Sequence, residues 1–360
     1  MSVSIKVGLI GAGCIGQLRA KSLAQVDGCV LLAVADVDLA RARAIAPSSD
    51  ISIFQNAQEM LSQVDLDAVI VSTPPQFHED LVVAAFKAGK HVLCEKPLAN
   101  SVEACRRMVD AARKNGKVLA TGFNHRYFPQ IQYLKQAIDT GRIGELDHVR
   151  AFAGHTGLSE FRNPWEYDKN VIGGGALMDV GIHIIDLTRY VLGEVAEVYG
   201  FTSNRVWNLG ASEDNGIALL RNPQGKYAVL QATWTEWKGY RFYLEAYGTK
   251  GMVRAYYAPM MNLLITQDKP GGRRKRTVRF YPMTMLREKL TGWQSSVIWM
   301  FQQELTDFVR LTRGEQSAIA DGVAGCRAVE IANAVYRSNR DHSVIRLAKN
   351  PSLFRDVDKP

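Results

Sequence analysis

The first third of the chain alternates short apolar runs with amphipathic segments. The runs that predict β-strands lie at residues 5–10, 30–35, 68–72, 91–94 and 118–121, with a weaker one at 51–54. The segments with helical periodicity between them include 15–26, 76–88 and 102–115. Apolar strands that alternate with helices predict a parallel sheet covered on both faces, with right-handed connections. We therefore expect an α/β domain with a doubly wound parallel sheet over residues 1–123.

The pattern changes after about residue 124, and a second domain is expected over residues 124–360. Helical patterns at 129–140 and 175–192 come first. Strand patterns without intervening helices follow at 195–204, 216–221, 227–235, 242–248, 252–257, 262–266 and 277–281. Helical patterns near 297–312 and 321–338 and a short strand at 344–347 close the chain. Because turns join these strands directly, we expect an α+β domain with a large, mostly antiparallel open sheet.

Length and composition indicate globular domains without a membrane segment. The 360 residues are 47% apolar and 22% charged. No apolar run approaches the roughly 20 residues that a membrane helix needs, and the N-terminus carries no export signal. The five cysteines form no C-x-x-C pair, which favours reduced thiols over disulfides or a zinc site. We therefore expect a cytoplasmic protein with no metal and no membrane partner.

Positive charge exceeds negative charge, with a formal net charge of +8. Part of the excess lies in the basic run from Arg273 to Arg276. A nucleic-acid surface would combine such a run with aromatic residues or a presenting helix, and the sequence has neither here. We expect a solvated hairpin loop and no nucleic-acid partner, while a mild preference for anionic ligands stays open.

A glycine-rich turn follows the first predicted strand and opens the first predicted helix. Its sequence is Gly11-Ala12-Gly13-Cys14-Ile15-Gly16, a G-x-G-x-x-G pattern in the context that dinucleotide binding requires. Gly11 permits a tight turn, Gly13 lets the backbone approach a pyrophosphate, and Gly16 allows close packing of helix on strand. The helix N-terminus adds N–H donors and partial positive charge. The first domain is therefore predicted to be a Rossmann domain whose cofactor contacts include Gly11, Gly13, Cys14, Ile15 and Gly16.

Asp36 ends the second predicted strand. A carboxylate at that point accepts hydrogen bonds from both ribose hydroxyls of NAD and repels the additional phosphate of NADP. Val37 follows, where a basic residue would favour NADP. NAD is the predicted cofactor, while Arg41 and Arg43 keep NADP possible, and a helix N-cap is the alternative role of Asp36.

Two further motifs carry candidate chemistry. Lys96, in Glu95-Lys96-Pro97, follows the strand at 91–94, where ligands bind in open parallel sheets. Its charge would stabilise an alkoxide during hydride transfer, and a surface lysine in a turn is the alternative. After the glycines 173–175, Asp179, His183 and Asp186 share one face of the helix predicted at 175–192. A histidine beside a carboxylate suits general-base catalysis, and a buried structural pair is the alternative.

Taken together, these motifs resemble one family. The set comprises Gly11–Gly16, Ser72-Thr73-Pro74-Pro75, Glu95-Lys96-Pro97 and the triple glycine followed by Asp179, His183 and Asp186. It is similar, from the first strand to the last helix, to the glucose–fructose oxidoreductase / inositol dehydrogenase / rhizopine catabolism family (Gfo/Idh/MocA). The resemblance implies an NAD-dependent dehydrogenase that acts on CH–OH groups of a sugar, sugar derivative or cyclitol. It also implies a cis Lys96–Pro97 bond and a homodimer or homotetramer formed through the open sheet.

The resemblance assigns roles to single positions. Lys96 is the catalytic lysine, and Asp179 with His183 forms the acid/base pair. The positions beside the nicotinamide or its ribose are Ser72, Thr73, Pro74, His78, Glu95 and Lys96. Arg126 resembles an arginine after the sixth strand, and Trp165 resembles a tryptophan before the triple glycine. An arginine commonly follows that tryptophan in the family, whereas this chain has Glu166.

We expect His183 to remove the hydroxyl proton while Asp179 orients its ring and Lys96 stabilises charge on the oxygen. Substrate contacts are expected from these three residues and from Arg126, His155, Trp165, Lys169 and Asn170. A surface position for His155 and a core position for Trp165 are the alternatives.

Two other functions are compatible with this sequence. Some relatives hold NAD tightly and use transient oxidation to eliminate a glycosidic leaving group in a redox-neutral cycle. A galactose-pathway repressor of the same family suggests a non-catalytic, NAD-responsive regulator. The presence of Lys96, Asp179 and His183 argues against the regulator.

Overall fold

The chain folds into two compact units. The computed structural model describes residues 4–46, 50–159, 161, 163–269 and 271–348. The first unit comprises Met1–Asn124 and Arg287–Cys326, and the second comprises His125–Leu286 and Arg327–Pro360. The first break falls one residue beyond the predicted boundary. The segment 287–326 differs from the prediction, which placed it in the second domain.

A six-stranded parallel sheet forms the centre of the first unit. Its strands are β1 (Ile5–Ile10), β2 (Cys29–Ala35), β3 (Ser52–Phe54), β4 (Ala68–Val71), β5 (His91–Cys94) and β6 (Leu119–Thr121). Their order is β3-β2-β1-β4-β5-β6, and all neighbours pair in parallel. Every residue of β4 is buried, as expected of a strand covered on both faces. The predicted Rossmann fold is confirmed.

Helices cover this sheet. They are α1 (Cys14–Leu23), α2 (Leu39–Ile45), α3 (Ala57–Gln63), α4 (His78–Lys87), α5 (Val102–Lys114) and α11 (Gln294–Thr312). Helix α11 comes from the C-terminal third of the chain. The segment 287–326 belongs to the first unit because Leu305 and Phe308 of α11 pack in the core that contains Leu9 and Ile70. The apolar face predicted for 297–312 is thus buried against the first unit.

A nine-stranded sheet forms the centre of the second unit. Its strands are β7 (Leu146–Gly154), β8 (Glu197–Ser203), β9 (Asn215–Arg221), β10 (Tyr227–Thr233), β11 (Arg241–Gly248), β12 (Gly251–Tyr257), β13 (Met261–Gln267), β14 (Arg274–Phe280) and β15 (Ile345–Arg346). The order is β14-β13-β12-β11-β7-β10-β9-β8-β15. Only the neighbours β7 and β10 run parallel, so the predicted, mostly antiparallel sheet is confirmed.

Strand β7 was not predicted, although it lies inside the sheet between β10 and β11. Its residues alternate in burial, with Val149 and Ala151 buried and Arg150 exposed. The outward face of the strand carries His148, Arg150 and Phe152, and the two polar residues interrupt the continuous apolar run typical of a strand buried on both sides.

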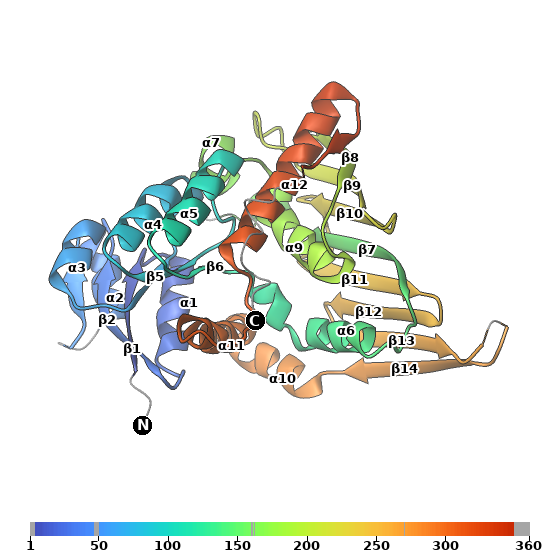
Figure 1. The fold of residues 1–360 in the computed structure, drawn as a ribbon, viewed down its shortest axis with the longest axis horizontal. Coiled ribbons are helices and arrows are strands. Elements are labelled where there is room, and N and C mark those ends of the chain that lie inside the picture. The colour runs from blue at the N-terminus through green and yellow to red at the C-terminus, as the bar shows by residue number, and fades with distance from the viewer. Residues whose placement is uncertain (1–3, 47–49, 160, 162, 270, 349–360) are drawn as a thin grey trace. The chain divides into compact units, whose positions relative to one another are not determined.

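The remaining helices are α6 (Pro129–Asp139), α7 (Lys169–Ile172), α8 (Ala176–Asp179), α9 (Gly181–Leu192), α10 (Pro282–Thr291) and α12 (Gly322–Asp341). Helices α6 and α9 pack on one face of the nine-stranded sheet (Figure 1). The other face carries partly or fully exposed side chains, among them Ile217 and Leu219. This open face agrees with the predicted open sheet.

The prediction of a single helix at 175–192 is wrong, because the structure has two helices there, α8 and α9, divided at Val180. The chain direction changes by 54° between Lys169–Asp179 and α9. A Cβ on Gly181 would lie 2.8 Å from the Ala232 side chain of β10, so this close approach requires glycine where α9 begins. Within the described residues no single helix is long and apolar enough to cross a membrane. This bent pair passes the same test of length and composition, but nearly all of α9 is buried in the protein.

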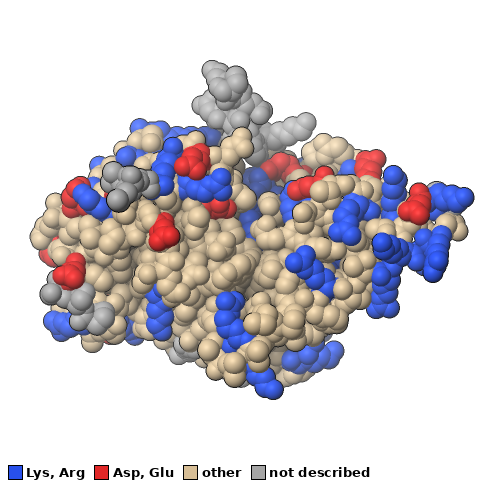
Figure 2. Space-filling model, turned by 90° about the horizontal axis from the view of Figure 1, so that it is seen from below, with Lys and Arg blue, Asp and Glu red and all other residues tan. Residues whose placement is uncertain are grey.

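The basic run is also different from its prediction. Arg274, Lys275 and Arg276 belong to edge strand β14 and pair with β13, instead of forming a hairpin loop. Figure 2 shows Lys and Arg side chains gathered over the projecting end of the β13–β14 hairpin. Charged side chains on an edge strand oppose pairing with other sheets, which gives the run a structural role.

Candidate functional site

The glycine turn of the first unit has the geometry that its sequence predicts. Gly11 has a φ of 96°, and the Ser72 hydroxyl donates to its carbonyl at 2.8 Å. A Cβ on Gly16 would lie 2.0 Å from the Gly11 oxygen, so only glycine allows α1 to pack this closely. A Cβ on Gly13 would meet nothing within 4 Å, and no side chain caps α1 there. This open space beside helix N–H groups fits a pyrophosphate.

Asp36 lies against the same turn. Its Oδ2 accepts from the Ala12 N–H at 2.6 Å, and its Oδ1 accepts from the Asp38 N–H at 2.8 Å. Asp38 caps α2 by accepting from the Ala40 N–H, so the N-cap role considered for Asp36 belongs to its neighbour. A carboxylate fixed at the end of β2 beside the glycine turn fits the ribose hydroxyls of NAD.

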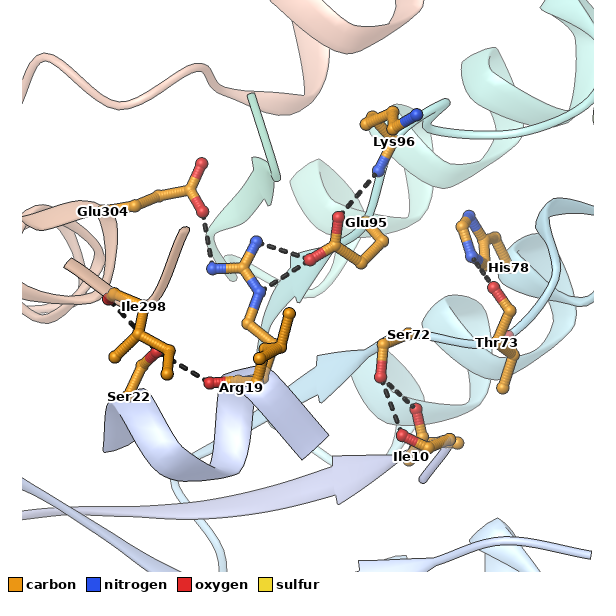
Figure 3. Close-up of polar contacts among 12 residues, drawn as sticks. Ile10, Arg19, Ser22, Ser72, Thr73, His78, Glu95, Lys96, Ile298 and Glu304 are labelled. Atoms are coloured by element: carbon orange, nitrogen blue, oxygen red, sulfur yellow. Dashed lines mark hydrogen bonds and ion pairs between the residues drawn. The ribbon is translucent and has the colours of Figure 1, made fainter. Parts of the chain in front are cut away.

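His78 joins the two loops that follow β4 and β5. Its Nε2 lies 2.8 Å from the Thr73 carbonyl oxygen (Figure 3). Its Nδ1 lies 3.2 Å and 3.1 Å from the carbonyl oxygens of Pro97 and Leu98. Burial lowers the pKa of His78, and the ring has no exposed surface. It therefore holds the loops in place, which differs from the direct cofactor contact predicted for it.

A buried ion-pair network lies behind the Glu-Lys-Pro motif. Arg19 on α1 donates through Nε to Glu95 Oε1 at 2.6 Å, and its second amino group lies 2.6 Å from Glu304 of α11 (Figure 3). Arg19 and Glu304 are completely buried, and the guanidinium stacks on Phe301 at 3.6 Å. Removing one member of such a network would leave uncompensated buried charge. Glu95 is thus anchored by Arg19, and any contact with the nicotinamide depends on that anchor.

Lys96 follows Glu95 at the carboxyl end of β5. The Lys96–Pro97 peptide bond is cis, which confirms that expectation. The Lys96 N–H donates to Glu95 Oε2 at 3.4 Å, and the side chain is half-buried. The backbone of the lysine is therefore tied to the buried network at the edge of the sheet where ligands bind in this fold.

In the second unit, Asp179 at the end of α8 is held by two donors. Its Oδ2 accepts from His155 Nε2 at 3.0 Å and from Trp234 Nε1 at 3.0 Å. The Nδ1 of His155 accepts from the Gly157 N–H at 3.0 Å, which places the proton of the neutral ring on Nε2. His155 is 6% exposed, so the surface position considered for it is wrong, and it orients the carboxylate.

His183, near the start of α9, is buried against a second histidine. The rings of His183 and His125 stack with centroids 3.7 Å apart and planes 24° apart. His125 Nε2 lies 2.7 Å from the Tyr240 hydroxyl oxygen. Burial raises the pKa of Tyr240, so its phenol stays protonated and can donate to His125. His125 thus lies between the His183 ring and the Tyr240 hydroxyl.

Asp186 of α9 binds Arg126. The guanidinium donates through Nε and a terminal nitrogen to the two carboxylate oxygens at 2.8 Å and 2.6 Å, and its Cζ lies 4.6 Å from the Tyr190 ring. Arg126 is 7% exposed. This bidentate pair fixes the short 3₁₀ helix Asn124–Tyr127 on α9. The arginine predicted to contact substrate therefore has a structural partner.

The other predicted substrate contacts are exposed. Trp165 belongs to the 3₁₀ helix Pro164–Tyr167 and is 38% exposed, so the core position considered for it is wrong. Lys169 and Asn170 at the start of α7 are exposed too. Glu166 accepts from the Asn163 N–H at 2.9 Å in a capping box. The glutamate that departs from the family pattern thus ends a hydrogen-bonded turn.

Several residues of these clusters were missed from the sequence. They are Arg19, His125, Trp234, Tyr240 and Glu304. One signal was visible, because Glu304 interrupts the apolar face of α11 between Phe301 and Phe308, and such a position requires a buried partner. Trp234 and Tyr240 reach the Asp179 and His183 clusters only through the folded sheet, so no local pattern marks them.

The first unit therefore has the geometry of a dinucleotide-binding domain, and the second holds a carboxylate and a histidine suited to acid/base chemistry. Among the described residues, no group of three or more His, Cys, Asp or Glu side chains is placed to hold a metal ion. The dinucleotide-binding geometry and the acid/base residues together are typical of nicotinamide-dependent oxidoreductases.

The chain belongs to the Gfo/Idh/MocA family. Residues 5–123 match the model for the oxidoreductase family with an NAD-binding Rossmann fold, and residues 131–254 match the model for the GFO/IDH/MocA C-terminal domain.

Named relatives cover nearly the whole chain. It is 30% identical over 356 residues to D-glucoside 3-dehydrogenase of Escherichia coli K12, covering 94% of this chain and 96% of the relative. It is 28% identical over 349 residues to myo-inositol 2-dehydrogenase of Thermotoga maritima, covering 95% and 98%. The solved structure of levoglucosan dehydrogenase in complex with NADH shares the fold, with a TM-score of 0.84, 23% identity, and coverage of 96% and 99%.

Proposed function

We propose that this chain moves a hydride reversibly between NAD and a secondary alcohol of a sugar, sugar derivative or cyclitol. The NAD-binding family model and the sugar and inositol dehydrogenases among its relatives support this activity. The observation that carries the catalytic assignment is the second unit's Asp179, held by two donors, close in sequence to a buried histidine, His183. Acid/base residues alone would fit many reactions, and the family membership specifies a redox reaction.

The proposed mechanism divides the work among three side chains. His183 accepts the proton of the substrate hydroxyl, and Asp179 stabilises the resulting positive charge. Lys96 places its ammonium beside the same oxygen and stabilises the negative charge that develops there. When bound, the nicotinamide supplies the acceptor for the hydride. The proposal requires the lysine of the first unit and the histidine of the second to act on one substrate molecule.

NAD is the proposed cofactor, because Asp36 is held beside the glycine turn. A phosphate on the adenosine ribose would meet its negative charge. Arg41, one of the two arginines that kept NADP open, lies 3.2 Å from the Asp38 carboxylate. That pairing reduces its availability to a phosphate.

The test is a panel of sugars, sugar acids, inositols and nucleotide sugars with NAD⁺ and NADP⁺, followed by the absorbance of the reduced nicotinamide. We expect turnover with at least one polyhydroxylated substrate and a preference for NAD⁺. Cleavage of an aryl glycoside by NAD-loaded enzyme without net NADH would favour the redox-neutral alternative. NAD binding without turnover of any substrate, together with a protein partner, would favour the regulator.

We also propose that the open face of the nine-stranded sheet forms the contact of a homodimer or homotetramer. Its side chains include Phe152, Phe201, Ile217, Leu219, Tyr227, Tyr243 and Tyr247. Arg150 and Arg254 lie 4.9 Å from the rings of Tyr247 and Tyr243. Aromatic, aliphatic and arginine side chains on one sheet face are typical of protein interfaces.

Leu219→Glu should dissociate this oligomer. Leu219 is 50% exposed in the single chain, and a carboxylate there would be buried without a partner in an assembled interface. Light scattering after size-exclusion chromatography should show a smaller species. Val206→Glu introduces the same charge at a loop position that is 48% exposed and should leave the mass unchanged. An unchanged mass for Leu219→Glu would remove this face from the assembly.

A cytoplasmic location is proposed on the basis of the thiols. No disulfide joins the five cysteines, which all lie within the described residues, and Cys94, Cys105 and Cys326 are buried. Cysteines kept as thiols suit a reducing compartment.

A further inference from the structure

The triple glycine before α8 is packed against two distant residues. Gly173 ends α7 with a φ of 88°. A Cβ on Gly174 would lie 2.0 Å from the Tyr336 hydroxyl oxygen, and a Cβ on Gly175 would lie 2.0 Å from the Glu213 carbonyl oxygen. The glycines therefore allow the turn to lie directly on Glu213 and Tyr336.

Glu213 binds three consecutive N–H groups at the start of α8. Its Oε2 accepts from the Gly175 N–H at 2.7 Å, and its Oε1 accepts from the Leu177 N–H at 2.8 Å. Its backbone oxygen accepts from the Ala176 N–H at 2.9 Å. The first N–H groups of a helix have no partner within the helix, so this buried glutamate acts as the cap of α8.

The neighbour of Glu213 is linked to the other end of α8. The Asp214 carbonyl oxygen accepts from the Trp234 N–H at 2.8 Å, and the Trp234 indole donates to Asp179. Oδ2 of Asp214 accepts from three successive N–H groups, those of Arg205, Val206 and Trp207. The loop that carries Glu213 and Asp214 is thus fixed, and it connects to both ends of the four-residue helix that carries Asp179.

We propose that Glu213 is a positioning residue: its carboxylate holds the triple-glycine turn and thereby keeps Asp179 in place for proton transfer, more firmly when ionised than when protonated. This inference rests on the proposed function for its kinetic consequence. The contacts that carry it lie entirely within the second unit.

The groups around Glu213 allow it to ionise near neutral pH. Burial raises the pKa of Glu213 to about 7, against the opposing effect of its hydrogen bonds. Tyr336 of α12 donates to Oε1 at 2.9 Å, and Lys169, Arg337 and Arg340 line the same cavity of about 340 Å³ as Glu213. The carboxylate accepts from the Gly175 and Leu177 N–H groups and from the Tyr336 hydroxyl, so a proton on either oxygen weakens this set of hydrogen bonds.

The test is Glu213→Gln, compared with the unmodified enzyme from pH 6 to pH 8. The amide keeps one acceptor oxygen and turns an NH₂ group toward a backbone N–H. At pH 8 we expect kcat to fall roughly 10- to 100-fold, the size of effect that misplacement of a catalytic group produces. The dissociation constant for NAD should stay unchanged. The kcat of the unmodified enzyme divided by that of Glu213→Gln should fall toward 1 as the pH falls below about 7, because protonated Glu213 then resembles glutamine.

Hydrogen–deuterium exchange supplies a readout that does not need activity. The amides of Gly175 and Leu177 should exchange faster in Glu213→Gln than in the unmodified protein. Tyr336→Phe removes one donor to Glu213 and keeps both backbone contacts, so exchange at the same two amides should be accelerated less than in Glu213→Gln. This variant replaces Glu213→Gln in the test if the latter does not fold. Glu330→Gln removes the half-buried carboxylate that pairs with Arg327 on α12 and should leave kcat unchanged.

Unchanged kcat in Glu213→Gln, or a ratio that stays constant between pH 8 and pH 6, would overturn the proposal. Unchanged exchange at both amides would overturn it as well. If the unmodified enzyme turned over no substrate, the proposed function would fail, whereas the exchange measurement would still decide whether Glu213 holds the turn.

Discussion

His183→Ala should lower kcat at least about 100-fold while NAD binding is retained, because general-base catalysis contributes about 10²- to 10⁴-fold. His183 is buried beside His125 in the second unit, and every residue of the cofactor turn lies in the first. The variant therefore removes the proton acceptor without touching the glycine turn or Asp36. Steady-state rates on the substrate found in the panel, together with NAD titration, measure both quantities.

A matched control tests whether the loss of activity is specific to His183 or follows from removing any histidine. His342 is exposed and has a φ of 48°, a conformation that asparagine tolerates well. His342→Asn should keep the rate of the unmodified enzyme. Turnover within a few-fold of normal in His183→Ala would show that another group accepts the proton.

His155 is the histidine most easily confused with this base. Its Nδ1 accepts from the Gly157 N–H, and its Nε2 donates to Asp179. In the neutral ring both nitrogens are already engaged, so His155 has no lone pair for a substrate proton in this arrangement. It acts by orienting the carboxylate, whereas His183 is the residue to which the proposed proton transfer is assigned.

The glycine turn could be predicted from the sequence because its contacts are local. Gly11, Gly13 and Gly16 lie within one strand–turn–helix unit, and their backbone requirements follow from that unit alone. The parallel sheet was predictable for a similar reason, since strands buried on both faces are continuous apolar runs. Strand β7 was not, because His148 and Arg150 on its open face interrupt the apolar run.

The buried charges were out of reach because their partners are distant in sequence. Arg19 meets Glu304, and Glu213 meets the backbone of Gly175, only after the chain has folded. Asp179 and His183 were selected as neighbours on one continuous helix. The structure instead separates them at Val180, so the continuous helix face on which they were selected does not exist. Their predicted catalytic role therefore rests on the motif resemblance alone.

Lys96→Met should lower kcat by roughly 10²- to 10³-fold, the range observed when a group that stabilises a developing oxyanion is removed. Methionine keeps most of the length of the side chain and removes only the charge. Lys96 is anchored through its backbone to Glu95, so the loop should keep its conformation. Lys114→Met, at an exposed position of α5, is the control for loss of a lysine and should leave kcat unchanged.

The double variant Lys96→Met, His183→Ala decides whether the two units serve one reaction centre. If Lys96 stabilises the oxygen from which His183 takes the proton, each loses most of its benefit once the other is gone. The combined loss in kcat should then be well below the product of the single losses, because residues that act as a unit are strongly non-additive. Two independent contributions would multiply instead. A fully multiplicative loss would therefore place Lys96 and His183 in separate steps, and the proposed mechanism would need another group to stabilise the oxygen.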